Sequence, residues 1–528
     1  MADRTVPLAP LSPEVVPHGF GGQAFFIVHE GPGGDQGVNA GITVVCLEGA
    51  VKGTEANKPV ADLFVFTVEE WDGVRRIHFS SGKGGDAMIV LSNIHKLYDG
   101  TSATSKAIHG KVDVWIDEGT IKAVTPHNPT RPQGSEVHRI DCSTYTVTPG
   151  LIDCHGHVTL WGVGKDELDR MNSPEAPFLA ERILYRTLVH GGVTTVRDVG
   201  GATGVLKRLV EEGVLLGPRL KLAICMLSTT GGHADFRSPD RCCGELSRLW
   251  PPGPGRPSSI VDGPWECRKR VREIAACGGD LVKICASPGV VSPTDHLEHR
   301  DFTLEEMAAI CDEAAGRGMY VAAHAHSQSG IRLAIQAGVK DIQHISFMNE
   351  ELAEQAYAKG CTVTPTSWVG QRLAQSTEFN DFIRAKVQQV SESHARAVQS
   401  AQASGLKLLA GTDPVLPDMH GRNYMELVAL IGEGVPPLAA WYGATGLAAD
   451  QLGLTDTGTL VEGKRADLLV CREDVVQDPS RLDYEALVEV MKDGWGYRNG
   501  LPGMRQRTFT HCVDLALGST ASPSTAKG

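Results

Sequence analysis

The sequence predicts an α/β fold: a (β/α)8 TIM barrel with a small composite β domain from both flanks and an extra N-terminal β unit. Two observations predict the barrel. Eight short apolar segments alternate with eight helical segments over about 300 residues of the chain, which is the arithmetic of that fold. Histidines, rather than a glycine-rich phosphate turn, follow the first segment. A doubly wound open sheet, the alternative, would want that turn.

The barrel elements are predicted in chain order from 149 to 446. Strands are predicted where short apolar runs end in turn residues: 150–155, 194–199, 219–226, 281–286, 320–324, 341–345, 362–366 and 407–413. Helices are predicted where apolar residues recur at three- and four-residue spacing: 180–190, 204–212, 266–277, 304–316, 331–337, 351–359, 382–403 and 424–431.

The flanks are predicted to be β structure. Short strands at 88–91, 112–116, 121–124 and 145–147 are separated by turn pairs such as Glu118-Gly119, and a β-like stretch returns at 458–470. We expect 87–148 and 447–517 to form one small β domain. Residues 1–86 contain four further runs, at 25–28, 42–46, 63–66 and 76–79, and predict an extra β unit beside that domain, at a subunit contact.

Composition excludes several classes of protein. The 50 basic and 63 acidic side chains give a net charge of -13, so no basic stripe is available for nucleic acid. The chain contains no uninterrupted run of about 18 apolar residues, the length that a membrane-spanning helix needs. The 13 cysteines are scattered and form no Cys-x-x-Cys pair, which favours reduced thiols. The N-terminus has no signal-peptide pattern, and we expect a cytoplasmic protein.

Candidate metal ligands gather at the predicted strand ends, where barrel enzymes place their catalytic groups. His155 and His157 point the same way in an extended chain and can hold one cation. One His-x-His tripeptide is weak evidence in a chain with 19 histidines. The set is stronger, because six candidates fall near the ends of five strands: His155, His157, Lys283, His324, His344 and Asp413.

Several motifs make a family resemblance visible. Segment 149–157, Pro-Gly-Leu-Ile-Asp-Cys-His-Gly-His, is similar to the first-strand signature of the amidohydrolase superfamily. Segments 192–198 and 411–413 are similar to its second and eighth strands. Segments 230–235, 282–290 and 323–326 resemble the imidazolonepropionase-related branch, which includes Xaa-Pro dipeptidases and ochratoxin-hydrolysing amidases. The resemblance covers roughly 87 to 475, and departs at Pro288, where a glycine is more usual.

The resemblance implies a binuclear metal site. His155 and His157 would hold one ion, and His324 and His344 the other. Lys283, carbamylated by carbon dioxide, would bridge them, and Asp413 would bind a metal and take the proton of the attacking water. Such ions can make hydroxide near neutral pH and polarise a carbonyl. Zinc is the default for this donor set, and spacing leaves cobalt and manganese open.

Substrate contacts are less defined by the sequence. His326 lies on the same strand face as His324 and could be the ligand in its place. The resemblance favours His324 as the ligand and His326 as a donor to the substrate. His233 is a second candidate substrate contact. The loops 228–265 and 287–301 should line the pocket, and Trp250 and Trp265 either face an aromatic substrate or pack the loop down.

These observations predict a metal-dependent hydrolase that cleaves an amide-type C–N bond in a small molecule. We expect a homo-oligomer with two divalent ions per chain. Carbamate or urea hydrolysis on an aryl substrate, with the same metals, is the related alternative. A non-catalytic barrel scaffold is the alternative from another class. Such a scaffold would be free to lose ligands, whereas all six candidates are present.

Overall fold

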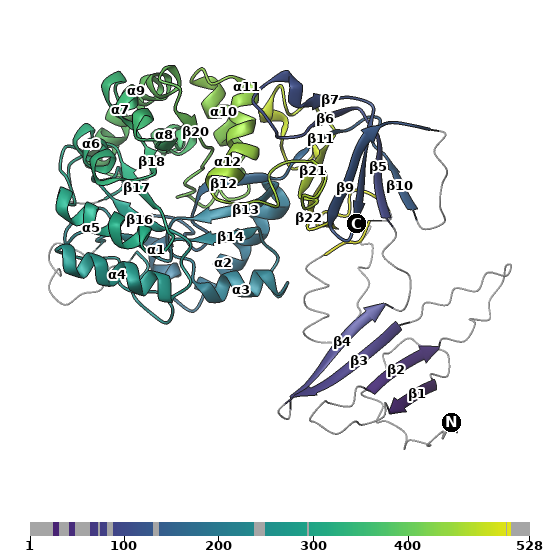
Figure 1. Cartoon of the computed structure of the whole chain (residues 1–528). Helices are drawn as coiled ribbons and strands as arrows, with labels where there is room; N and C mark the ends of the chain where they lie inside the picture. The colour runs from purple at the N-terminus through teal and green to yellow at the C-terminus, as the bar shows by residue number, and fades with distance from the viewer. Residues whose placement is uncertain are drawn as a thin grey trace. The chain divides into compact units, whose positions relative to one another are not determined.

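The chain divides into two compact units, residues 1–87 with 519–528 and residues 88–518 (Figure 1). The computed structural model describes 25–30, 42–47, 64–71, 74–81, 88–129, 137–236, 249–292, 295–377, 379–502 and 504–507. In the first unit it describes an antiparallel sheet of neighbouring strands, β1 (Phe25–Glu30), β2 (Ile42–Leu47), β3 (Phe64–Trp71) and β4 (Val74–Ser81). These strands coincide with the four apolar runs at 25–28, 42–46, 63–66 and 76–79.

The second unit contains two β-sheets besides its β/α part, and their strands come from the segments before and after that part in the sequence. One has the order β10-β5-β8-β9 and the other the order β23-β22-β21-β11-β6-β7. The strands before the β/α part are β5 (Met88–Ile94), β6 (Lys96–Tyr98), β7 (Ile108–His109), β8 (Val112–Asp117), β9 (Thr120–Pro126), β10 (Val137–Asp141) and β11 (Thr146–Pro149). Those after it are β21 (Leu468–Cys471), β22 (Leu487–Lys492) and β23 (Trp495–Gly496). Because β11 pairs with β21, strands from both flanks share one sheet.

The predicted β-like stretch at 458–470 is wrong for most of its length. Only its last residues, from Leu468, form a strand. Gly458 and Gly463 both have φ +84, a left-handed conformation that interrupts extended backbone. The alternating pattern there belongs to consecutive turns.

Parallel strands alternate with helices from residue 151 to 432, as in a TIM-barrel-type fold. The strands are β12 (Leu151–Gly156), β13 (Val193–Asp198), β14 (Arg219–Leu222), β15 (Met226–Leu227), β16 (Val282–Cys285), β17 (Val321–Ala325), β18 (Asp341–His344), β19 (Thr362–Thr364) and β20 (Lys407–Leu408). They form two ladders in sequential order, β12 to β14 and β15 to β20. This order favours the barrel over a doubly wound sheet, whose strand order doubles back.

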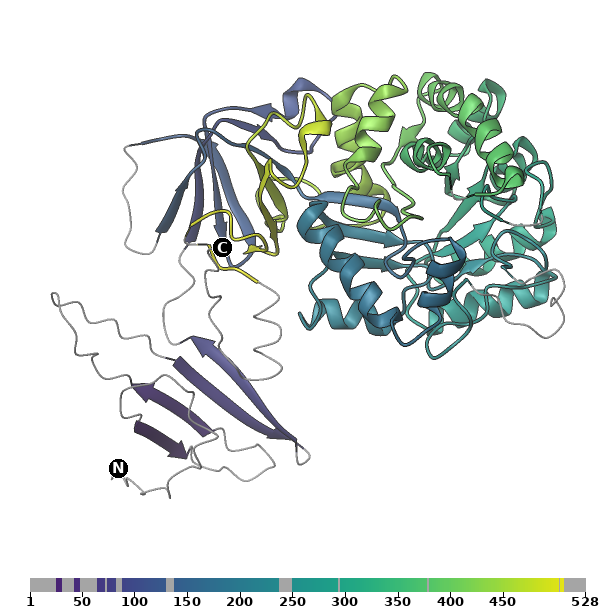
Figure 2. The same ribbon diagram turned by 180° about the vertical axis from the view of Figure 1, so that it is seen from behind.

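Helices cover the outer faces of these strands; α4 to α7 lie outside β16 to β18 in Figure 1, and Figure 2 shows the same layering from behind. The predicted helices are present as α2 (Ala176–Tyr185), α3 (Gly204–Glu211), α4 (Pro264–Ala276), α5 (Leu304–Ala315), α6 (Gln328–Ala337), α7 (Glu350–Ala358), α9 (Asp381–Ala403) and α10 (Met425–Gly432). The sequence did not predict α1 (Lys165–Met171), α8 (Ser367–Ala374), α11 (Pro437–Gly443) or α12 (Gly446–Gln451). These four have at most eight residues, too short for a clear helical period.

Two predicted strands differ from the structure. The third strand is split into β14 and β15, because Ile224 has φ +66 and turns the chain between them. The eighth ends at Leu408 rather than 413. Its continuation still bonds to β12, since Cys154 N donates to Ala410 O at 2.9 Å and Asp413 N to His155 O at 2.8 Å.

A buried guanidinium crosses the interior of the β/α part. Arg197 on β13 donates from Nη2 to Asp341 Oδ2 on β18 at 2.6 Å and from Nε to Cys154 O on β12 at 2.5 Å. Its Nη1 reaches Tyr320 Oη at 3.3 Å. Both charged side chains are at most 2% exposed. The ion pair therefore ties strands that are far apart in sequence.

No helix in the described ranges has the length and apolar character needed to cross a bilayer. The cysteines whose side chains the structure describes, from Cys142 to Cys471, form no disulfide bond with one another.

We expect Arg197→Met to lower the free energy of unfolding by about 3–5 kcal/mol, because it leaves Asp341 as a buried carboxylate without its cation. Urea unfolding followed by circular dichroism measures the change. The matched control is Arg208→Met on α3, whose pair with Glu212 is exposed (58% and 48%), and which should change stability by no more than about 0.5 kcal/mol. An equal decrease in the free energy of unfolding in both variants would contradict a stabilising role of the Arg197–Asp341 ion pair.

Candidate functional site

The structure brings the six predicted ligands to one end of the parallel strands. His155 is on β12, His157 follows its last residue, Lys283 is on β16, His324 on β17 and His344 on β18, while Asp413 follows β20. The four histidines and Lys283 are at most 5% exposed, and Asp413 is half-buried.

Asp413 faces the first histidine pair. Its Oδ1 lies 3.5 Å from His155 Nε2 and 3.4 Å from His157 Nε2. His157 Nδ1 is 3.1 Å from Gly200 O; because a carbonyl only accepts, Nδ1 carries a proton, and Nε2 is the ring nitrogen that faces Asp413. His155 Nδ1 is buried with no hydrogen-bond partner among the described residues. This half of the site therefore offers imidazole lone pairs beside a carboxylate.

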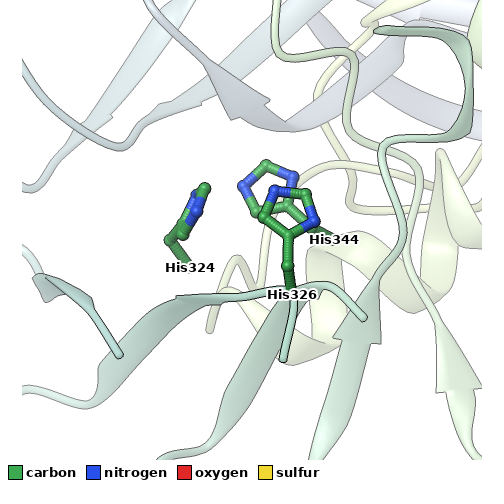
Figure 3. A group of neighbouring side chains, drawn as sticks. All are labelled: His324, His326 and His344. Atoms are coloured by element: carbon green, nitrogen blue, oxygen red, sulfur yellow. The ribbon is translucent and has the colours of Figure 1, made fainter. Parts of the chain in front are cut away.

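The second group of histidines comes from β17, β18 and the turn after β17. His324, His326 and His344 offer ring nitrogens within 4.8 Å of one another, and so, with a carboxylate oxygen, do His155, His344 and Asp413. Figure 3 shows the first three rings projecting toward a common space. His344 belongs to both groups, so the two candidate metal clusters are contiguous.

Backbone strain aims His344 into the site. Gln343 is in register with His324, so alternation would turn His344 to the opposite face. Instead, His344 and Ile345 have φ +70 and +51, which interrupts the alternation. Each such residue costs about 1–3 kcal/mol. His344 Nδ1 lies 2.7 Å from Thr366 Oγ1, and its buried Nε2 has no partner in the described chain.

The four imidazoles of these two groups, those of His155, His324, His326 and His344, are held in the neutral form. Burial lowers the pKa of His155, His324, His326 and His344 well below the usual range, and neighbouring charges add to this effect. A neutral imidazole is the form that binds a metal.

Lys283 is fully buried and oriented by an amide. Its Nζ donates to Gln343 Oε1, and Gln343 Nε2 donates to Asp341 Oδ2 at 2.9 Å. Burial lowers the pKa of Lys283 to about 8, although the carboxylate of Asp413 opposes the shift. In a fraction of the molecules, the Lys283 side chain is thus an uncharged amine at neutral pH, which is the nucleophilic form.

Two buried aspartates that the sequence analysis did not single out position the first strand. Asp153 accepts from His155 N at 2.9 Å, from Thr412 N at 3.1 Å and from Asn423 Nδ2 at 2.7 Å. Asp198 accepts from Val158 N at 2.8 Å. Asp153 lies two residues before His155 and so on the same strand face, which was an available signal.

Close packing explains two glycines at the site. A Cβ at Gly411 would lie 2.7 Å from His155 Cβ, and one at Gly289 only 2.0 Å from His233 Cε1. His233 itself stacks on His324, with ring centroids 4.2 Å apart. Pro288, the departure from the family pattern, accepts from His324 Nε2 at 3.3 Å through its carbonyl.

The two tryptophans of the long loop have different environments. Trp250 is 5% exposed and packs on His157, with ring centroids 5.0 Å apart, so its role here is packing. Trp265 on α4 is 84% exposed and does not line the cavity. Of the predicted pocket loops, residues 237–248 and 293–294 lie outside the described residues.

A cavity opens beside the histidines and contains about 460 Å³ of space free of protein atoms, including its open mouth. Its polar side contains His233, His324, His326, His344, Ser346, Thr366, His394 and Asp413. Its other side is apolar, with Val290, Val291, Val369, Gly370, Leu373, Val390 and Val415. No arginine or lysine is among the described lining residues.

A buried ammonium holds one wall of this cavity. Lys386 on α9 donates to Gly289 O at 2.9 Å, Ser292 O at 2.8 Å and Asp295 Oδ1 at 3.1 Å. It is 4% exposed. The segment carrying Val290 and Val291 is thus wrapped around a cation from a helix.

Comparison with known proteins gives consistent likenesses. Residues 146–496 match the model of the amidohydrolase family. The ochratoxinase of Aspergillus niger is 32% identical over 62% of this chain and 71% of that protein. The imidazolonepropionase of Paracoccus denitrificans is 25% identical over 70% of this chain and 89% of that protein. A crystal structure of a Xaa-Pro dipeptidase with bound methionine superposes with a TM-score of 0.69 at 30% identity, covering 78% of this chain and all of that one (100%).

We expect Lys386→Met to loosen the cavity wall, because it leaves Asp295 and two carbonyls buried without their cation. Removing one partner of a buried pair typically costs about 3–5 kcal/mol. Hydrogen exchange should become faster in peptides spanning 287–292 and stay unchanged in β16. Lys407→Met is the control, since Lys407 is 54% exposed and lies 4.0 Å from Asp450. Unchanged exchange at 287–292 would contradict this role.

Proposed function

The chain belongs to the amidohydrolase family, and on that premise we propose that it is a binuclear metal-dependent hydrolase that cleaves an amide-type C–N bond in a small molecule. The observation that carries the proposal is the convergence of five histidines, a buried lysine and a carboxylate at one end of the parallel strands: His155, His157, His324, His326, His344, Lys283 and Asp413. We also propose that the two strand ladders close into one eight-stranded barrel. The hydrogen bonds of Cys154 and Asp413 across β12, together with one from Asp280 N to Leu222 O at 2.7 Å, support this closure.

The residues fit two divalent cations. His155 and His157 would hold one, His324 and His344 the other, and Asp413 would be a further ligand. The fit rests on the neutral rings of His155, His324 and His344, on the unpartnered Nδ1 of His155 and Nε2 of His344, and on the nearby carboxylate of Asp413. Nitrogen and oxygen donors of this kind favour zinc. When bound, two such ions supply Lewis acidity toward a carbonyl and lower the pKa of water.

Lys283 would complete the site as a carbamate. An ammonium repels cations, whereas the amine can add to carbon dioxide, forming an N–C bond and releasing one proton. The side-chain charge thus changes from 0 in the amine to −1 in the carbamate, or from +1 when the proton lost by the ammonium is included, and two oxygens become available. The carbamate nitrogen keeps one hydrogen, which Gln343 Oε1 can still accept. Gln343 is held in that orientation by Asp341.

The chain's own residues would then handle the substrate. Asp413 is positioned to accept the proton of the attacking water at Oδ1, between His155 and His157. His326 lines the cavity next to His324 and would contact the substrate directly. His233, on the other side of His324, would be a second contact.

The apolar wall restricts the substrate class. Six of the described lining residues are branched aliphatic side chains, and no lysine or arginine among them could neutralise a carboxylate. An uncharged apolar group is therefore the natural occupant of that side, because burying an unpaired charge there is costly.

We expect two metal ions per chain, and we expect Lys283→Ala to lose both together with at least ~10³-fold of the turnover, since metal activation contributes several kcal/mol. Plasma emission analysis and hydrolysis of N-acyl amides measure the two losses. Lys283→Glu, which supplies a permanent carboxylate, should retain part of the metal. Lys207→Ala is the control, because Lys207 lies on α3 and pairs with Asp280. A single metal with full activity in Lys283→Ala would refute the binuclear proposal.

A substrate panel tests the bond and the apolar wall together. Neutral N-acyl amides with a branched or aromatic group should have kcat/KM values at least ~10-fold higher than matched analogues carrying a carboxylate on that group, because desolvating an unpaired charge costs more than 1.4 kcal/mol. Aryl carbamates and ureas in the same panel test the alternative bonds. Faster cleavage of the charged analogues would contradict the proposed substrate class.

A further inference from the structure

A chain of hydrogen bonds runs from the cavity to the outer helices. His326 Nδ1 lies 2.8 Å from Ser346 Oγ, and Ser346 Oγ lies 3.3 Å from His394 Nδ1. His394 Nε2 lies 3.2 Å from Ser367 Oγ, which donates to Glu433 Oε2 at 2.6 Å. All five side chains are at most 8% exposed. They come from the turn after β17, the turn after β18, α9, α8 and the residue that follows α10.

The carboxylate at one end determines the direction of every bond. Burial raises the pKa of Glu433, while the hydrogen bonds from Ser367 and Gln371 oppose that shift. In its ionised form Glu433 only accepts, so the single hydroxyl proton of Ser367 points to it. Ser367 Oγ must then accept from His394 Nε2. Burial lowers the pKa of His394 to about 4, so this ring is neutral and its Nδ1 accepts from Ser346.

The direction of the hydrogen bond between Ser346 and His326, at the cavity, follows in the same way. Because the hydroxyl proton of Ser346 is given to His394, Ser346 Oγ can only accept from His326. The proton of His326 is therefore on Nδ1, and Nε2 carries a lone pair. His326 lines the cavity, and Figure 3 shows its ring beside those of His324 and His344.

We propose that Glu433 is a positioning residue that fixes His326 as the Nδ1–H tautomer, so that His326 presents a hydrogen-bond acceptor to the cavity. In terms of the proposed hydrolase, on which this role rests, the acceptor receives a donor group of the substrate, such as an amide N–H. This differs from the donor role that the family resemblance suggests for His326. The tautomer itself does not depend on which bond is cleaved.

The far end of the chain is accessible to mutation without touching the cavity. Gln371 Nε2 lies 3.5 Å from Glu433 Oε1, and Gln399 Nε2 donates to the main-chain oxygen of Glu433 at 3.2 Å. Both glutamines are exposed. Gln399 therefore provides a matched control, since it contacts Glu433 without taking part in the chain.

The direct test is the tautomer of the two histidines in the full-length protein labelled with 15N-histidine. Two-bond 1H–15N correlation spectra distinguish Nδ1–H from Nε2–H rings, and His326→Gln and His394→Gln assign the signals. We expect His326 as the Nδ1–H form and His394 as the Nε2–H form. The opposite tautomer at His326 in the unmodified chain overturns the proposal.

Variants then test whether Glu433 is the cause. Ser367→Ala cuts the chain and Glu433→Gln replaces the obligatory acceptor by an amide; each should produce mixed tautomers at His394 and His326. Each should also lower kcat/KM for N-acyl amides by about 5- to 10-fold, the effect of one weakened hydrogen bond. Gln399→Ala should change neither the tautomers of the two histidines nor kcat/KM. Because the spectra need no substrate, failure of hydrolysis alone would count against the proposed function only. A His326 tautomer that stays unchanged in Ser367→Ala, with the chain folded by circular dichroism, overturns the role of Glu433.

Discussion

The site depends on a charge placed where water cannot reach it. A guanidinium buried among parallel strands must be surrounded by acceptors, and Arg197 obtains them from Asp341, from the main chain of Cys154 and from Tyr320. Asp341 in turn accepts from Gln343, whose oxygen accepts from Lys283. The orientation of the Lys283 side chain is thus a consequence of the buried ion pair between Arg197 and Asp341, which fixes Gln343.

Burial favours the uncharged form of both kinds of basic group above that layer. It keeps the imidazoles neutral and able to bind a cation, and it lowers the pKa of Lys283 to about 8, where the amine becomes reactive. Both effects follow from the same absence of solvent. A carboxylate at the half-buried edge, Asp413, is left as the group that faces both the first histidine pair and the cavity.

Much of this arrangement could be predicted from the sequence because it is local. The period of two brings His155 and His157 to one face, and the strand–helix alternation places Lys283 and His324 on parallel strands. His344 was predicted from its strand end, but its direction depends on a left-handed φ that no pattern reports. Non-local contacts were beyond the sequence: His394 reads as one residue of an amphipathic helix, and Lys386 as a surface lysine.

Lys386 also has a consequence for how the cavity wall responds to its surroundings. Loops that wrap main-chain and carboxylate oxygens around a cation are usually assembled by a metal ion, and they come apart when the ion dissociates. Here the cation is covalently attached to α9, and the oxygens of Gly289, Ser292 and Asp295 surround it. The loop therefore has a ligand at permanently high local concentration. Removal of the two metal ions that we propose for the site would leave this wall in place, so the metal-free protein would keep a preformed apolar face.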